Sequence, residues 1–275
     1  MSISVLISVY KSERPEFLQK ALHSVWDSQT LKPDEIVLIE DGPLTNELLN
    51  VLNKWEHRLG NKLKRIVNKQ NLGLTKSLNR GLKVATGEYI ARMDSDDIST
   101  PERFELQCKY LDTHPGISVV GGSLQEFDST SDNLGIRHYP LTNEQVIKYI
   151  KKASPLAHPT VMMRREIFDA NIYYDERYRT SQDIALWFDI LVSGRKIANL
   201  NEVTIKFRRD GDVFRRRSRD KAKNELIIYL QGIRRLYGYF NPYYIYPIIR
   251  FIFRILPVSI VKMIYGSSLR TKFLH

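Results

Sequence analysis

The amino-acid sequence predicts an α/β protein with a mainly parallel sheet flanked by helices, followed by an amphipathic helical extension at the C-terminal end. In the first 113 residues, short apolar runs rich in β-branched side chains alternate with segments of helical periodicity. Short connections join these segments, and repeated β-α-β units of this kind form parallel sheets with helices on both faces. A change in charge indicates the extension, since the last quarter of the chain is strongly basic and the rest is near neutral.

Each element of the sheet is predicted from its own pattern. The first strand is the β-branched run at 3–9, and because no positively charged segment or cleavage site precedes it, it is interpreted as a strand and not as a signal peptide. Further apolar runs predict strands at 35–40, 63–67 and 89–93. Apolar side chains at helical spacing predict helices at 15–29, 45–59, 72–86 and 101–113, two of which open with a proline suited to a first turn.

Composition narrows the class of protein. Hydrophobic residues make up 43% and charged residues 27% of the 275 residues, which argues against a disordered or fibrous chain. The single cysteine, Cys108, excludes a disulfide framework and a cysteine-based zinc site, and it is typical of a reducing compartment.

The net charge of +11 is concentrated near the C-terminal end. From Lys206 onward there are 16 basic and 4 acidic residues, whereas residues 1–205 hold 26 basic and 27 acidic ones. This asymmetry favours a near-neutral catalytic body and a tail for an anionic surface or ligand. A merely solvated basic face is the alternative.

Polar side chains follow every predicted strand. Tyr10 to Glu13 follow the first, Asp41 and Gly42 the second, Asn68 and Asn71 the third, and Asp94 to Asp97 the fourth. In open parallel sheets ligands bind beyond the carboxyl ends of the strands, so these side chains should converge on one site. Neither G-x-G-x-x-G after the first strand nor a P-loop motif occurs, so a dinucleotide site or a P-loop is not expected.

The segment Asp94-Ser95-Asp96-Asp97 suggests a metal site. Three carboxylates in four residues repel one another and are costly unless a cation lies among them. Carboxylate oxygens suit Mg²⁺ or Mn²⁺, which complete their coordination with phosphates and water. The alternative is a solvated acidic turn that caps the next helix through Asp97, Ser99 or Thr100.

These strand-end motifs resemble the nucleotide-binding half of family-2 glycosyltransferases. The motifs are Ser8-Val9-Tyr10, Glu40-Asp41-Gly42, Asn71-Leu72-Gly73-Leu74 and Ala91-Arg92-Met93-Asp94-Ser95-Asp96-Asp97. The likeness continues through His158-Pro159-Thr160, Gln182-Asp183, Phe207-Arg208, Arg216-Arg217, Arg250…Pro257 and Ile264-Tyr265…Leu269-Arg270. That longer pattern is similar to bacterial O-antigen and amylovoran-type exopolysaccharide glycosyltransferases.

The resemblance implies a GT-A fold, a nucleotide-diphosphate sugar donor and inversion at the anomeric carbon. It implies that Tyr10 and Asp41 hold the uracil ring, by stacking and by accepting from its N3–H, and that Glu13 lies close to the nucleoside. Asp94 would face the ribose, and Asp96 would bind Mn²⁺ or Mg²⁺ on the diphosphate. The remaining residues assigned to nucleotide-sugar binding are Val9, Asn71, Lys76, Ser95 and Arg216.

An inverting transfer also needs a base for the acceptor hydroxyl. Asp183 opens a predicted helix with an apolar stripe formed by Ile184, Trp187, Phe188, Leu191 and Val192, which would fix its carboxylate. Dipole complementation at a helix N-terminus is the alternative, and the match to the family's acidic motif favours the base. Gln182 stands where the family more often has Glu, and Asp175 and Asp189 are weaker candidates.

Three residues are possible contacts of the acceptor or donor sugar: His158, Gln182 and Trp187. For His158, the alternative is a hydrogen-bonded structural group. In the tail, Arg250 and Arg254 interrupt an apolar run and lie one helical turn apart, which argues against a membrane-spanning helix. They favour an interfacial helix at an anionic leaflet, or else an amphipathic helix packed on the body.

The sequence therefore predicts a metal-dependent, inverting hexosyltransferase that moves a sugar from a UDP-sugar to a polyprenyl-diphosphate-linked saccharide in O-antigen, capsule or exopolysaccharide synthesis. Residues 1–210 form the predicted catalytic domain, with a nucleotide-sugar half at 1–100 and an acceptor half at 101–210. Residues 211–275 form the basic extension, at the cytoplasmic face of the cell membrane. A metal-dependent nucleotidyltransferase is an alternative, but residues 10–14 lack its glycine-rich loop. A nucleic-acid-binding protein is a weaker one, because acidic strand ends repel phosphate, and no nucleic-acid partner is expected.

Overall fold

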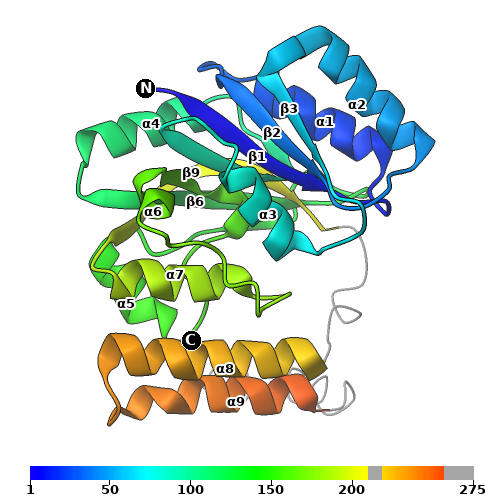
Figure 1. Cartoon of the computed structure of the whole chain (residues 1–275). Helices are drawn as coiled ribbons and strands as arrows, with labels where there is room; N and C mark the ends of the chain where they lie inside the picture. Colours follow the sequence, from blue (N-terminus) through cyan, green and yellow to red (C-terminus); the bar gives the residue numbers. More distant parts are fainter. Residues whose placement is uncertain (210–218, 257–275) are drawn as a thin grey trace. The chain divides into compact units, whose positions relative to one another are not determined.

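The computed structural model describes residues 1–209 and 219–256. The chain divides into two compact units, Met1–Asp210 and Gly211–His275, and each is described by itself. Figure 1 shows the sheet of the first unit with its helices, and the helix pair of the second.

Within residues 1–209, the strands form one mixed sheet in the order β3-β2-β1-β4-β8-β6-β9-β5, and β7 pairs with β6. The strands are β1 Ile3–Val9, β2 Glu35–Glu40, β3 Leu63–Val67, β4 Tyr89–Asp94, β5 Ile98–Ser99, β6 Ile117–Phe127, β7 Gly135–Arg137, β8 Met162–Arg164 and β9 Lys196–Arg208. The helices are α1 Pro15–Trp26, α2 Asn46–Leu59, α3 Leu74–Leu82, α4 Arg103–Thr113, α5 Asn143–Ile150, α6 Glu166–Asp169 and α7 Gln182–Val192.

The four predicted strands form the parallel part of this sheet. β1 pairs in parallel with β2 and with β4, and β2 pairs in parallel with β3. β8 then runs antiparallel to both β4 and β6, whereas β9 is parallel to β6. The predicted class, an α/β fold with a mainly parallel sheet flanked by helices, is confirmed.

Helices cover both faces of the parallel strands. Side chains on one face of β1, among them Ile3, Val5 and Ile7, belong to a buried core with side chains of α1, α2 and α4. α3 packs on the opposite face, because a Cβ at Gly81 would lie 2.3 Å from Leu6 Cδ1 and 2.6 Å from Ile39 Cδ1. Glycine at this position lets the helix approach the sheet closely.

Some predicted boundaries are wrong. The helix predicted at 72–86 is shorter, since α3 begins at Leu74, after Gly73 with φ +86°. The helices predicted at 15–29 and 101–113 are α1 at Pro15–Trp26 and α4 at Arg103–Thr113. β5, β6, β7 and β9 were not predicted.

The second unit contains α8 at Arg219–Tyr237 and α9 at Ile245–Ile255, which pack side by side. Arg250 and Arg254 of α9 both lie 2.8 Å from the carboxylate of Glu225, a buried residue of α8. Both arginines therefore have a carboxylate partner within the unit, and the predicted contact of this helix with an anionic membrane stays a prediction. A buried carboxylate requires cationic partners, and helical spacing in α9 alone does not reveal that Glu225 needs them.

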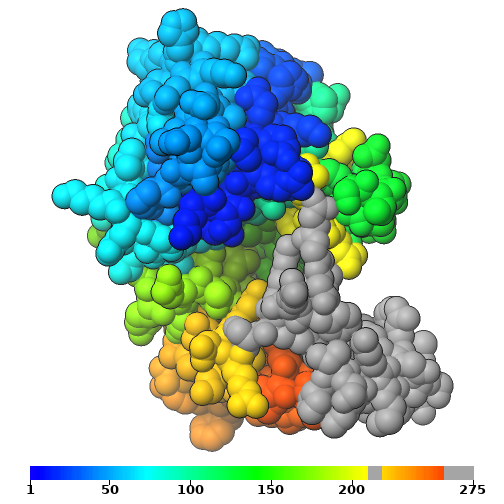
Figure 2. Space-filling view, turned by 90° about the vertical axis from the view of Figure 1, so that its right-hand side faces the viewer, coloured from blue at the N-terminus to red at the C-terminus, as the bar shows by residue number. Residues whose placement is uncertain are grey.

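The side chains that α9 does expose are apolar. Ile245, Ile248, Ile249, Ile252 and Ile255 are 38–51% exposed, and they recur at helical spacing. Both helices reach the surface in the space-filling view of Figure 2. In the part of the chain that the structure describes, no helix combines the length and the apolar character needed to span a bilayer. Arg216 and the motifs from Pro257 onward lie outside the described residues.

Candidate active site

The predicted site residues gather at the carboxyl edge of the parallel strands. In the register of the sheet, Ser8 of β1 lies opposite Asp94 of β4, and Val9 lies opposite Glu40 of β2. The residues that follow these strands therefore start from the same edge. Tyr10 is 48% exposed there, as a ring that stacks on a ligand must be.

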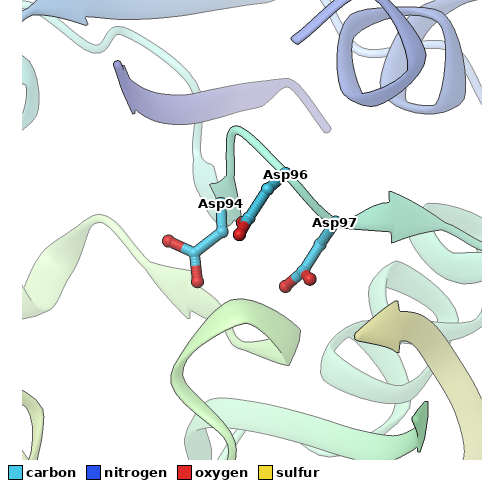
Figure 3. A group of neighbouring side chains, drawn as sticks. All are labelled: Asp94, Asp96 and Asp97. Carbon is cyan, nitrogen blue, oxygen red and sulfur yellow. The ribbon is translucent and has the colours of Figure 1, made fainter. Parts of the chain in front are cut away.

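Asp94, Asp96 and Asp97 form the metal-ligand candidate. They lie in the turn from β4 to β5, and one carboxylate oxygen of each lies within 4.8 Å of those of the other two. Figure 3 shows the three carboxylates on the same side of this turn. Ser95, between them, is buried and donates a hydrogen bond to Glu13, which links the turn to the loop after β1.

Two arginines already compensate part of this negative charge. The buried Arg92 forms a bidentate ion pair with Asp94, with Nη1 2.6 Å from Oδ2. The backbone N–H of Arg208 donates to Asp97 Oδ1 over 2.8 Å, and its Nε–H donates to the carbonyl of Asp96 over 2.9 Å. Among the described residues, no cation forms an ion pair with the carboxylate of Asp96. The guanidinium of Arg92 is thus the cation beside Asp94, whereas the carboxylate of Asp96 has no cationic partner among the described residues.

Burial disfavours the charged forms of Asp96 and Asp97 and so raises their pKa values. Burial, with the nearby Asp94 and Glu13 carboxylates, raises the pKa of Asp96 to about 6. Burial also raises the pKa of Asp97, and its Oδ2 is buried with no hydrogen-bond partner. An unpartnered carboxylate oxygen beside Asp96 fits a hard divalent cation such as Mg²⁺ or Mn²⁺, which prefers oxygen ligands.

Asp41 organises the loop that precedes α3. Its Oδ1 accepts from the Asn68 side chain over 2.9 Å and from the Leu72 N–H over 2.7 Å, and its Oδ2 accepts from the Gly73 N–H over 3.0 Å. Each carboxylate oxygen can accept two hydrogen bonds, so Oδ2 retains capacity for one further donor. That capacity is what the predicted contact with the uracil N3–H requires.

Close backbone packing completes this loop. Gly42 has φ +89°, and a Cβ there would lie 2.7 Å from the backbone nitrogen of Asn71. The side chain of Asn71 donates to the carbonyl of Asp41 over 3.2 Å, and Lys76 is exposed in the first turns of α3. The residues after β2 and those before α3 are thereby held together at the sheet edge.

Asp183 is far from these loops in the sequence and lies in the first turn of α7. Ser181, with φ +59°, precedes the helix, and Gln182 is buried. Ile184, Trp187, Phe188 and Leu191 are buried as predicted, so the helix that carries Asp183 is fixed by its core contacts. The side chain of Asp183 is half-buried.

His158 and Trp187 lie inside the protein. His158 Nε2 is 2.7 Å from the hydroxyl of Tyr174, and burial holds the pKa of His158 well below its usual range, so the ring is neutral. The rings of His158 and Trp187 lie in a T-shaped arrangement, with their centroids 6.1 Å apart. Trp187 is completely buried, so in this structure its side chain presents no surface to a sugar. His158 thus makes the hydrogen bond that the structural alternative expects, and its contact with a sugar stays a prediction.

Two residues that hold the site were given no role by the sequence reasoning, because Arg92 and Arg208 hold the carboxylate turn. Asn68, which donates to Asp41, was among the polar residues expected at the strand ends. Arg92 stands two residues before Asp94, so strand alternation places both side chains on the same side of the sheet. For Arg208, 112 residues from Asp96, no local signal exists.

Comparisons with known proteins agree with this geometry. Residues 4–171 match the model of the family described as glycosyl transferase family 2. The chain is 36% identical over 267 residues to the amylovoran biosynthesis glycosyltransferase AmsE of Erwinia amylovora, covering 96% of this chain and 98% of that protein. It is 30% identical over 269 residues to the UDP-Gal:alpha-D-GlcNAc-diphosphoundecaprenol beta-1,3-galactosyltransferase of Escherichia coli, covering 97% and 96%. The crystal structure of S. aureus TarS 1–349 in complex with UDP is 19% identical and superposes with a TM-score of 0.64 over 98% of this chain and 73% of that one, which shows the same fold.

Proposed function

This chain is a glycosyltransferase of family 2 with the GT-A fold, and from that premise we propose that it transfers a hexose from a UDP-sugar to a lipid-linked saccharide with inversion. The observation that carries the proposal is the juxtaposition of the Asp94–Asp97 turn and the Asp41 loop at one sheet edge. The first suits a diphosphate with its metal, and the second suits a pyrimidine.

On the donor side, each residue has a proposed task. Tyr10 stacks on the uracil, Asp41 accepts from its N3–H, and Asp94 faces the ribose. Val9, Glu13, Asn71, Lys76, Ser95 and Arg216 complete the proposed nucleotide-sugar contacts. Asp96 would hold Mn²⁺ or Mg²⁺, with the open oxygen of Asp97 beside it, and the cation would stabilise the charge of the leaving diphosphate.

On the acceptor side, Asp183 is the proposed base. The acceptor oxygen forms its bond to the anomeric carbon while the bond from that carbon to the phosphate oxygen breaks. The hydroxyl proton passes to the carboxylate of Asp183, and UDP leaves. Gln182 and His158 remain proposed neighbours of the sugars.

Asp183→Asn tests this role, because asparagine keeps the size of the side chain and removes proton acceptance. We expect kcat to fall by about 10²-fold or more, the usual scale of general-base catalysis, with the Kd for UDP unchanged. Near-native turnover of this variant would place the base elsewhere, and Asp175 would be tested next.

The proposals for the acceptor and for the cellular location rest on the names of the relatives and on the surface of the second unit. The Escherichia coli relative bears the name of an acceptor linked to diphosphoundecaprenol, and the Erwinia relative is named for amylovoran biosynthesis. We therefore propose a polyprenyl-diphosphate-linked acceptor in surface-polysaccharide synthesis, reached at the cytoplasmic face of the cell membrane. The exposed isoleucines of α9 and the basic charge of the second unit support contact with an anionic membrane surface.

The donor is tested with a panel of UDP-sugars, a GlcNAc-diphosphate lipid and Mn²⁺, with UDP release as the measurement. We expect one UDP-hexose to be turned over, and DNA or RNA not to bind in competition with it. Release of pyrophosphate from a nucleoside triphosphate, with no UDP released from any UDP-sugar, would overturn the proposal in favour of a nucleotidyltransferase.

A further inference from the structure

α3 carries buried polar side chains that serve two separate parts of the site. Toward the nucleotide side, the hydroxyl of Ser77 accepts from the Asn68 amide over 2.9 Å, and Arg80 also pairs with Asn68, which in turn donates to Asp41. Toward the acceptor side, Thr75 and Asn79 bind the segment 174–178.

The acceptor-side contacts are short and specific. The Thr75 hydroxyl donates to the carbonyl of Tyr178 over 2.6 Å. The Asn79 amide donates to the carbonyl of Tyr174 over 2.8 Å and to the Glu176 carboxylate over 3.1 Å. The carbonyl oxygen of the same amide accepts from the Tyr174 N–H over 3.1 Å.

These bonds fix a segment that otherwise has no regular structure. Thr75 and Asn79 are 3% and 5% exposed, so each hydrogen bond they lose leaves a buried polar group unsatisfied. The third anchor is His158, which binds the hydroxyl of Tyr174. Only residues 179–181 separate the tethered segment from α7, which carries Asp183 in its first turn.

We propose that Thr75 and Asn79 are positioning residues that set the place of Asp183 relative to the nucleotide pocket, with α3 as the rigid link between them. The inference rests on the proposed role of Asp183 as the base. A displacement of about 1 Å in a reacting group can cost about 10²-fold in rate, so the segment's placement affects turnover without touching the nucleotide.

Thr75→Val tests the link, since valine has nearly the same shape and lacks the hydroxyl. We expect kcat to fall at least about tenfold, with the Kd for UDP in calorimetry unchanged within about twofold. Thr75→Ser keeps the hydroxyl and should restore kcat, which a loss of packing alone would not do. Ser77→Ala, on the nucleotide side of the same helix, should instead weaken UDP binding.

Amide hydrogen exchange gives a second readout that does not depend on the donor sugar. In Thr75→Val, exchange in residues 174–181 should accelerate at least about tenfold, and in Thr75→Ser it should stay native. If Thr75→Val does not fold, Asn79→Asp is used, because it retains the acceptor for the Tyr174 N–H and loses the two amide donations.

Two results separate this inference from the proposed function. Suppose that Thr75→Val or Asn79→Asp has native kcat and native hydrogen exchange, while Asp183→Asn is inactive. This result would overturn the positioning role alone. A fully active Asp183→Asn would remove Asp183 as the base, and the inference with it, whatever the tether variants show.

Discussion

The three carboxylates of the site differ in what already balances their charge. Asp94 is committed to Arg92, and Asp97 accepts from the backbone of Arg208. Asp96 lacks an ion pair among the described residues, and its pKa is raised to about 6. The proposed metal-binding role is therefore assigned first to Asp96, while Asp94 keeps one orientation through its bidentate arginine.

Asp96→Asn should abolish transfer and leave the fold intact, because the leaving diphosphate loses its metal anchor. EDTA should inhibit the native enzyme, and Mn²⁺ or Mg²⁺ should restore it. The measurement is UDP release, with circular dichroism as the check on folding. Full activity in EDTA would contradict the metal role.

We expect His158 to make the free energy of unfolding of the first unit depend on pH. Its pKa is lower in the folded protein than the ordinary value of 6.5, so the unfolded chain binds a proton that the folded one does not. The contribution of the neutral His158 to the free energy of unfolding is fully present above about pH 6.5. Below that pH the contribution falls, by up to about 1.4 kcal/mol per pH unit.

His158→Gln lacks this titration and should be less sensitive to acid. The stability advantage of the native chain over this variant should therefore shrink by about 1 kcal/mol between pH 6.5 and pH 5.5. Urea unfolding followed by tryptophan fluorescence measures this, since Trp26, Trp55 and Trp187 all lie in the first unit. An advantage that stays constant over this range would show that His158 titrates normally.

At the scale of elements, the parallel half of the sheet could be predicted because its signals are local. A continuous β-branched run such as 3–9 predicts a buried strand from its own residues. Parallel pairing then brings Asp41 and Asp94 to one edge of the sheet. The second half of the sheet follows long-range pairings, such as Ile98 of β5 with Lys206 of β9, which no local pattern encodes. The same reason hides the contact between Arg208 and Asp96, and the tether from Asn79 to Tyr174.

The close approach of Gly42 to Asn71 gives a prediction for this loop. In Gly42→Ala, the added Cβ would meet backbone 2.7 Å away at a residue with φ +89°, so the loop must shift. We expect the Kd for UDP to rise by at least about tenfold and stability to fall by about 1–2 kcal/mol. Gly60→Ala, also at positive φ but with open space around it, controls for backbone strain alone and should leave the Kd for UDP native.

At the scale of the whole molecule, charge and apolar exposure separate the two units. The first 205 residues are near neutral, and the basic residues follow them. Within the second unit, Arg250 and Arg254 neutralise Glu225, whereas Arg219, Lys223 and Arg234 of α8 are exposed. Contact with an anionic surface would thus use the basic residues of α8 for attraction and the isoleucine face of α9 for insertion.

The separate roles proposed for the basic residues of α8 and the isoleucines of α9 predict how the protein binds vesicles. The native chain should sediment with phosphatidylglycerol-containing vesicles at low salt and be released at high salt, because screening weakens the attraction. Ile248→Asn with Ile252→Asn, at side chains 42% and 47% exposed, should weaken sedimentation roughly 30-fold, from a loss of about 1 kcal/mol of apolar burial at each site. Ile136→Asn changes an equally exposed isoleucine of the first unit and should leave sedimentation native. UDP binding should persist in both the double variant and the control. Native protein that stays in the supernatant at low salt would refute membrane contact through α9.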